Sequence, residues 1–273
     1  MGMRANAVPP ILGAHGERLM IRACAAAAAL LFIAHADAAA AADIKGLSGS
    51  ATEPAMALLI PQFERQSGHK VILDSDAAIG AMTERVLKGE AADVVIVSGP
   101  QIALLEQAGR VVPGTRADIA KVGVGLFVRK GDPRPDIGSV EAFKRTLLAA
   151  RSIGWNDPAA GAPVSIYMLS VLQRLGIADD MRAKTVTFRQ RSERFAAVAR
   201  GDVEIGFNQV SEILAAAGVE LLGPLPGPIQ NYTLFAGAVA SASREPEAAQ
   251  ALLRFLASPA AQATWKAKGF EAP

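Results

Sequence analysis

The chain has 273 residues, a formal net charge of +2, and a composition that is 51% hydrophobic and 20% charged. Its charges are scattered, so the concentrated basic face on which nucleic-acid binding depends is not expected. The only cysteine is Cys24, in an apolar N-terminal segment. The rest of the chain must therefore fold without a disulfide.

The N-terminal segment has the pattern of a secretory signal peptide. Arg22 precedes an apolar run that ends at Ala34, and small residues in Ala-x-Ala order follow it. The run is shorter than the roughly 20 residues that a membrane span requires. We therefore predict a signal peptide at residues 1–42, with translation starting at Met1 or Met20, and a mature protein in the periplasm.

Strand-like and helix-like patterns alternate through the remainder of the chain. Short runs rich in β-branched residues predict strands at 70–74, 94–98, 122–129, 152–155, 185–189, 204–208 and 233–240. Apolar residues at helical spacing predict helices at 54–67, 78–88, 102–107, 140–149, 163–175, 194–200, 245–256 and 259–266. This alternation predicts an α/β fold with a mostly parallel sheet covered by helices.

The helix at 54–67 has the clearest pattern. Met56, Leu59 and Phe63 recur at helical spacing, and Gly68 follows at the position where glycine commonly ends a helix. We expect these three side chains to face the core.

The sequence contains no pattern typical of a hydrolytic or metal-dependent site. It lacks a Gly-x-Ser-x-Gly turn, a Walker-type phosphate loop and any His, Cys or carboxylate cluster with metal-ligand spacing. We therefore assign no catalytic residue, expect no cofactor or metal, and look for a binding function.

Several segments, taken in order, resemble the periplasmic molybdate-binding family of type II solute-binding proteins, which serve ABC transporters. The matching segments are Gly-Ser-Ala-Thr at 49–52, Phe-Glu-Arg-Gln-Ser-Gly at 63–68, Gly-Glu-Ala-Ala-Asp-Val-Val-Ile at 89–96, Asp-Pro at 157–158 with Pro-Val-Ser-Ile-Tyr at 163–167, and Gly-Asp-Val-Glu-Ile-Gly-Phe at 201–207.

The resemblance implies a two-lobed α/β fold of the periplasmic-binding-protein type II class, with a ligand cleft between the lobes. It places one lobe at residues 43–122 plus 236–273 and the other at 123–235. It also implies a monomer that captures a small anion and delivers it to the membrane subunits of an ABC transporter. Helix N-termini around the cleft would supply backbone N–H groups to the anion.

The first half of the implied ligand site departs from the family. The family's first ligand serine falls on Ala51, which is flanked by Ser50 and Thr52, and its second falls on Ile79, just before Gly80. Neither Ala51 nor Ile79 carries a hydroxyl, although their backbone N–H groups remain.

The second half of the site departs in the same way. The family's backbone-donating alanine falls on Val164, beside Ser165, and its ligand tyrosine falls on Gln209, next to Asn208. With both serines and the tyrosine replaced, a ligand other than tetrahedral molybdate is favoured.

Basic residues gather where the family has a helix-start donor. Arg189, Arg191 and Arg194 lie close together with Ser192, although a basic helix start opposes the helix dipole. A guanidinium grips a planar carboxylate through two parallel hydrogen bonds. The cluster therefore favours a carboxylate ligand held by Arg191 and Ser192; a solvated basic surface that binds nothing is the alternative.

An enzymatic alternative also stays open. Some proteins that resemble this family isomerise unsaturated tricarboxylates such as aconitate. That reaction needs an acid or base beside the bound carboxylates, and the sequence does not identify one.

Overall fold

The computed structural model describes residues 1–2, 41–160 and 163–273. Nearly all of the predicted signal peptide lies outside these residues. Among the helices that are described, none is both long and apolar enough to cross a membrane.

Ten strands are described, and they join through hydrogen bonds in the order β2-β1-β3-β9-β4-β7-β5-β6, with β8 and β10 also paired to β4. The strands are β1 (Asp43–Ser48), β2 (Lys70–Asp74), β3 (Val94–Ser98), β4 (Ala117–Arg129), β5 (Ile153–Asn156), β6 (Thr185–Phe188), β7 (Ile205–Gln209), β8 (Val219–Pro224), β9 (Tyr232–Val239) and β10 (Phe270–Glu271).

Helices lie between most of the strands, as the alternating pattern predicts. They are α2 (Glu53–Ser67), α3 (Ile79–Leu87), α4 (Gly99–Gln107), α5 (Val140–Ala149), α6 (Pro163–Arg174), α7 (Ala178–Arg182), α8 (Arg191–Arg200), α9 (Val210–Ala215), α10 (Pro246–Leu256) and α11 (Pro259–Ala267), with short 3-10 turns η1 (Ser50–Thr52), η2 (Pro158–Ala160) and η3 (Gly227–Ile229).

The sheet is less parallel than the sequence predicts. Strand β1 runs parallel to β2 and β3, and β5 runs parallel to β6 and β7. In the middle, however, β9 is antiparallel to β3 and β4, and β4 is antiparallel to β7 and β8. Parallel pairing is thus confined to the two ends, where helices cross between strands.

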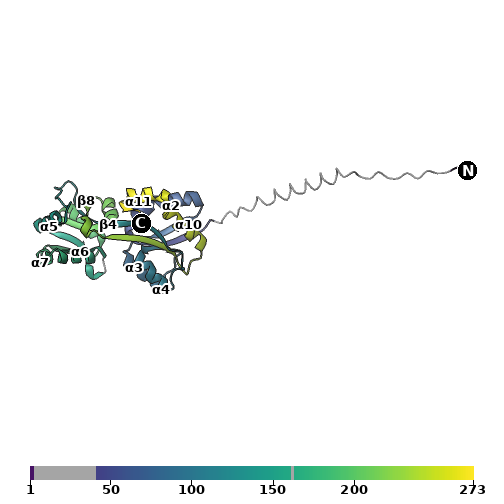
Figure 1. Ribbon diagram of the computed structural model, residues 1–273, viewed down its shortest axis with the longest axis horizontal. Coiled ribbons are helices and arrows are strands. Elements are labelled where there is room, and N and C mark those ends of the chain that lie inside the picture. The colour runs from purple at the N-terminus through teal and green to yellow at the C-terminus, as the bar shows by residue number, and fades with distance from the viewer. Residues whose placement is uncertain (3–40, 161–162) are drawn as a thin grey trace. The chain divides into compact units, whose positions relative to one another are not determined.

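Strand β4 passes from one half of the sheet to the other. Its residues 117–123 pair with β9, and its residues 124–129 pair with β7 and β8. In Figure 1, β4 lies between the group that contains α2, α3, α4, α10 and α11 and the group that contains α5, α6 and α7.

Separate hydrophobic cores lie on either side of this crossing. One core draws its buried residues from 42–122 and 235–270, and the other two draw theirs from 124–229. The protein therefore has the two-lobed α/β fold that the resemblance implies. We name the halves the β3 lobe, with β1–β3 and β10, and the β5 lobe, with β5–β8.

Candidate functional site

A cavity of about 460 Å³ lies between the two lobes, a volume within the usual range for small-molecule sites. The β3 lobe supplies five of the lining residues and the β5 lobe the other twelve. The lining residues are Ser50, Ala51, Asp76, Ala78, Ile79, Asn156, Pro163, Val164, Ser165, Arg189, Gln190, Arg191, Ser192, Arg194, Asn208, Gln209 and Glu212.

Tight packing around Gly49 forms the wall on the β3 lobe. A Cβ atom at this glycine would lie 2.7 Å from Cγ1 of Ile79. A larger residue would therefore fit here only if its neighbours shifted. The next residue, Ser50, donates its backbone N–H to the carbonyl of Ala77 at 3.0 Å. The chain after β1 is thereby held against the start of α3, which brings Ser50 beside Ile79 in the cavity.

The start of α8 forms much of the opposite wall. Gln190 caps this helix, and its backbone N–H donates to the Glu193 carboxylate at 3.3 Å, which completes a capping box. Along α8, Arg194 shares its buried face with Ala197 and Val198, because residues three and four apart lie on one side of a helix. The basic start of α8 is thus capped, and its fourth residue turns inward.

Arg194 is a buried cation with unused hydrogen-bond donors. Its side chain lines the cavity, yet the residue is only 2% exposed. Nη1 donates to Oδ1 of Asn156 at 2.6 Å, whereas Nε and Nη2 are buried and have no acceptor among the described residues. Burial lowers the pKa of Arg194 to about 10, with Glu212 acting in the opposite direction and Arg191 reinforcing the decrease. At neutral pH, Arg194 is therefore a charged group without a full set of partners.

Arg191, one turn earlier, has its own counter-charges. Nη1 donates to Oε1 of Glu212 at 2.5 Å, and Nη2 lies 3.5 Å from Oε2 of Glu53. Burial alone would lower the pKa of Arg191, but the two carboxylates outweigh burial and raise the pKa above its ordinary value. The charge of Arg191 is thus already paired with carboxylates of the protein.

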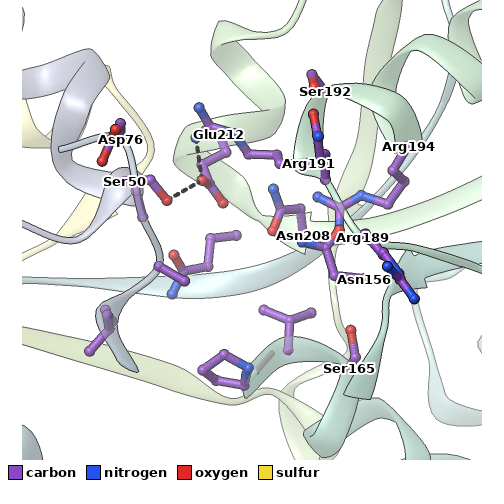
Figure 2. A pocket seen from close by; sticks show the side chains of 17 residues that line it. Ser50, Asp76, Asn156, Ser165, Arg189, Arg191, Ser192, Arg194, Asn208 and Glu212 are labelled. Atoms are coloured by element: carbon purple, nitrogen blue, oxygen red, sulfur yellow. Dashed lines mark hydrogen bonds and ion pairs between the residues drawn. The ribbon is translucent and has the colours of Figure 1, made fainter. Parts of the chain in front are cut away.

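Asn208 provides a second buried donor beside Arg194. It is near the end of β7, and its Nδ2 atom is buried without an acceptor among the described residues. Figure 2 shows Asn208, Asn156 and Arg194 gathered on the same side of the cavity, with Ser165 also labelled there. Buried polar groups are nearly always satisfied. Unsatisfied donors on two neighbouring residues therefore mark the part of the cavity that is best suited to receive a hydrogen-bond acceptor.

Most of the predicted ligand residues come together in this cavity. Those that line it are Ser50, Ala51, Ile79, Val164, Ser165, Arg191, Ser192, Asn208 and Gln209. Their role in binding remains a prediction.

Two predicted ligand residues, Thr52 and Gly80, do not line the cavity. Thr52 is fully buried; its Oγ1 donates to the carbonyl of Gly49 at 3.0 Å and lies 2.6 Å from Oγ of Ser48. Its hydroxyl is therefore committed to holding the η1 turn. Gly80 is in the first turn of α3, immediately after Ile79, which does line the cavity.

Sequence reasoning missed Glu212 and Asn156 as site residues. Glu212 follows β7 by three positions and Asn156 ends β5, so both occupy the strand ends where ligands of α/β folds commonly bind. That position was the available signal. It is weak because many polar residues follow strands.

The comparisons with known proteins agree with the two-lobed fold. The family model described as bacterial extracellular solute-binding protein matches residues 44–271. This chain belongs to that family. The described residues of this solute-binding protein contain no group of three His, Cys, Asp or Glu side chains that could hold a metal ion.

Relatives of this solute-binding protein carry different names. It is 34% identical to an aconitate isomerase from Pseudomonas sp over 218 residues, 78% of this chain and 79% of the relative. It is 28% identical to the molybdate-binding protein ModA of Azotobacter vinelandii over 244 residues, 85% of this chain and 91% of that protein. The solved periplasmic molybdate-binding protein of A. vinelandii superposes with a TM-score of 0.70 at 21% identity, covering 84% of this chain and 99% of that structure, a likeness in fold.

Proposed function

We propose that this protein captures a small carboxylate-bearing anion in the cavity between its lobes. The observation that carries the proposal is the guanidinium of Arg194, whose Nε and Nη2 are buried and find no acceptor in the described part of the chain. A carboxylate would accept from both nitrogens at once in the bidentate geometry that suits arginine. The neighbouring Nδ2 of Asn208 would supply a further donor.

The hydroxyl groups near the cavity support a carboxylate over a tetrahedral oxyanion such as molybdate. Oγ of Ser50 donates to Glu212 at 3.0 Å, and Thr52 is engaged within its own turn. Ala51 and Ile79 have no side-chain hydroxyl. An oxyanion would thus find few free hydroxyl donors on the β3 lobe, whereas a planar carboxylate matches the donors of Arg194.

The lobe ranges we propose are 43–122 plus 236–273 and 123–235, supported by the separation of the hydrophobic cores. Side-chain hydrogen bonds near the cavity already bridge the lobes: Ser50 to Glu212, Arg191 to Glu53, and Oγ of Ser211 to the carbonyl of Ala51 at 2.9 Å. Closing the lobes over a ligand would exclude water and strengthen its contacts with Arg194.

The setting of this function is part of the proposal. We propose that the signal peptide at residues 1–42 directs the protein to the periplasm, where it acts as a monomer and delivers its ligand to the membrane subunits of an ABC transporter. The family description, an extracellular solute-binding protein, and the name of the molybdate-binding relative support this setting. N-terminal sequencing of the periplasmic protein would test it.

Calorimetry and thermal shift with di- and tricarboxylates, molybdate and sulfate would test the ligand class. We expect a carboxylate to raise the unfolding temperature, because a ligand at 100 times its dissociation constant stabilises the fold by roughly 2.7 kcal/mol. Tight molybdate binding with no response to any carboxylate would contradict the proposal.

A second function is favoured by one observation. The relative that is 34% identical over 78% of this chain is named an aconitate isomerase. The same cavity could hold an unsaturated tricarboxylate such as aconitate while a proton is moved within it. Incubating the protein with trans-aconitate and following the cis isomer would separate an enzyme from a receptor.

A further inference from the structure

The cavity contains a carboxylate that a simple anion receptor does not need. Glu212 is 7% exposed and lines the cavity from α9. Figure 2 shows its carboxylate between Ser50 and Arg191, each joined to it by a dashed line. A fixed negative charge repels an anionic ligand. If the site had only a binding function, Glu212 would therefore lower its affinity for the anion.

The two oxygens of this carboxylate differ. Oε1 accepts from Ser50 Oγ at 3.0 Å and from Arg191 Nη1 at 2.5 Å. Oε2 accepts no hydrogen bond from any side chain or backbone group that the structure describes. Oε1 is therefore held in place by residues of both lobes, and Oε2 is available to a hydrogen atom of the ligand.

We propose that Glu212 is the group that takes and returns a proton when this protein isomerises an unsaturated polycarboxylate. The proposal rests on the second function above, and on the coexistence of Glu212 with the unsatisfied donors of Arg194 and Asn208 in one cavity. Arg194 and Asn208 hold a carboxylate of the substrate, while Glu212 faces the carbon skeleton. Arg191 and Ser50 are positioning residues that fix Oε1.

The chemistry is a 1,3-proton shift. Oε2 takes a proton from the methylene carbon, and the electrons of that C–H bond form a new double bond to the central carbon. The electrons of the old double bond move to the far carbon, which is stabilised by its adjacent carboxylate. The protonated Glu212 then returns its proton to that far carbon. No atom or electron is gained or lost overall, and the new double bond forms in either geometry.

Proton NMR of trans-aconitate with the full-length protein tests this step. The parent is expected to form the cis isomer and, in D₂O, to introduce deuterium at the methylene position. Glu212→Gln keeps the size of the side chain and an oxygen that can accept from Ser50 and Arg191, but it removes the basic carboxylate. Since general acid–base groups typically contribute about 10²–10⁴-fold, its isomerisation and deuterium exchange should fall by that factor. Glu220→Gln, on an exposed residue of β8 paired with Arg134, is the matched control and should keep the parent rate.

Calorimetry with trans-aconitate on the same proteins distinguishes the possible outcomes. Retained binding by Glu212→Gln, together with lost turnover, supports the assignment and shows that the variant is folded. Undiminished turnover by Glu212→Gln overturns it. A parent that binds trans-aconitate without isomerisation or deuterium exchange overturns the catalytic inference but leaves the carboxylate receptor intact. A parent that binds no carboxylate overturns both.

Discussion

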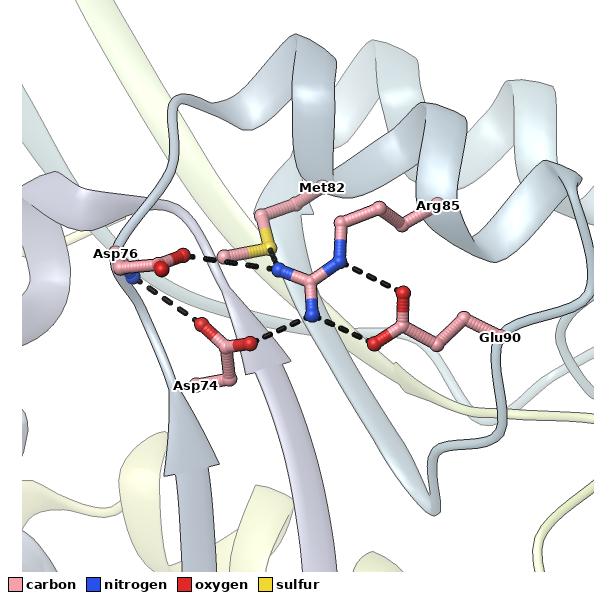
Figure 3. Close-up of polar contacts among 5 residues, drawn as sticks. All are labelled: Asp74, Asp76, Met82, Arg85 and Glu90. Atoms are coloured by element: carbon pink, nitrogen blue, oxygen red, sulfur yellow. Dashed lines mark hydrogen bonds and ion pairs between the residues drawn. The ribbon is translucent and has the colours of Figure 1, made fainter.

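Arg85 and Arg194 have the same guanidinium group, but Arg85 is surrounded by carboxylates and Arg194 is buried beside a cavity. Arg85 has carboxylates on every side: Nη2 lies 2.6 Å from both Asp74 and Glu90, and Nη1 lies 3.7 Å from Asp76 (Figure 3). Its side chain is 31% exposed. Arg194 is nearly inaccessible and, within the described ranges, has one hydrogen-bond acceptor, Asn156.

The comparison separates an arginine committed to the fold from one that we propose binds the ligand. The acceptors around Arg85 raise its pKa, and the cluster ties α3 to the end of β2 without a free donor group facing a cavity. Burial lowers the pKa of Arg194, which means that the ligand-free fold disfavours its charge. A buried charge of this kind next to a cavity supports the proposal that a partner of opposite charge binds there.

Replacing Arg194 should have the largest effect. Truncating a buried charged contact typically costs about 2–5 kcal/mol, so Arg194→Met should weaken carboxylate binding by roughly 30-fold or more in calorimetry. Without ligand, the free energy of unfolding of the same variant should exceed that of the parent by about 1–3 kcal/mol, because unsatisfied buried donors are removed.

The control is Arg200→Met at the other end of α8, where the arginine is exposed and paired with Asp202 at 2.7 Å. It should leave binding unchanged. Loss of stability together with undiminished binding in Arg194→Met would assign Arg194 to the structural class instead.

Asn208→Leu should have the next largest effect on binding. Leucine keeps a similar size but removes the Nδ2 donor, which has no acceptor among the residues that the structure describes. A hydrogen bond to a charged group contributes about 1.5–3 kcal/mol, so the dissociation constant should rise about 10- to 100-fold. An unchanged constant with an unchanged unfolding temperature would remove Asn208 from the site.

Arg191→Ala should act mainly on stability, in contrast with Arg194→Met. It leaves the buried Glu212 carboxylate with Ser50 as its remaining partner, and an unsatisfied buried group costs about 1–3 kcal/mol of unfolding free energy in urea titrations. Combining it with Glu212→Gln should recover part of the loss, since a neutral amide needs no cation. If Arg191→Ala instead loses binding more than Arg194→Met does, the sequence-based assignment of Arg191 as the main ligand residue holds.

Arg85→Ala should have the smallest effect and none on binding, because exposed ion pairs contribute little. Its signature is pH dependence. Arg85 lowers the pKa of Asp74 and of Glu90 below their ordinary values, so its stabilising effect is present above an ordinary carboxyl pKa of about 4 and is lost as pH falls through the lowered values. The stability difference between parent and variant should therefore shrink from pH 7 to pH 3; a constant difference would contradict this account.

Local patterns were sufficient to predict much of the fold. The predicted bounds of β2, β3 and α5 match the structure, and Met56, Leu59 and Phe63 of α2 are buried as expected. Strand β8 was missed; its sequence ends in a glycine and a proline, which are uncommon in strands. It forms because β4 continues past its pairing with β9 and offers its edge to residues 219–224, a long-range pairing that leaves no local pattern.

The sequence by itself determined the order of most of the strands and helices, the resemblance to a family, and a basic cluster at the start of α8. The elements follow from spacing along the chain and from the preferences of single residues, and the family follows from the resemblance of the matching segments. Only the tertiary structure decided what each arginine does. Arg191 and Arg194 are three residues apart and chemically identical, but Glu212 of α9 and Glu53 of α2 make their direct contacts with Arg191. Charge pairing and burial are set by segments distant in sequence, and the difference between a committed arginine and an available one arises from their packing.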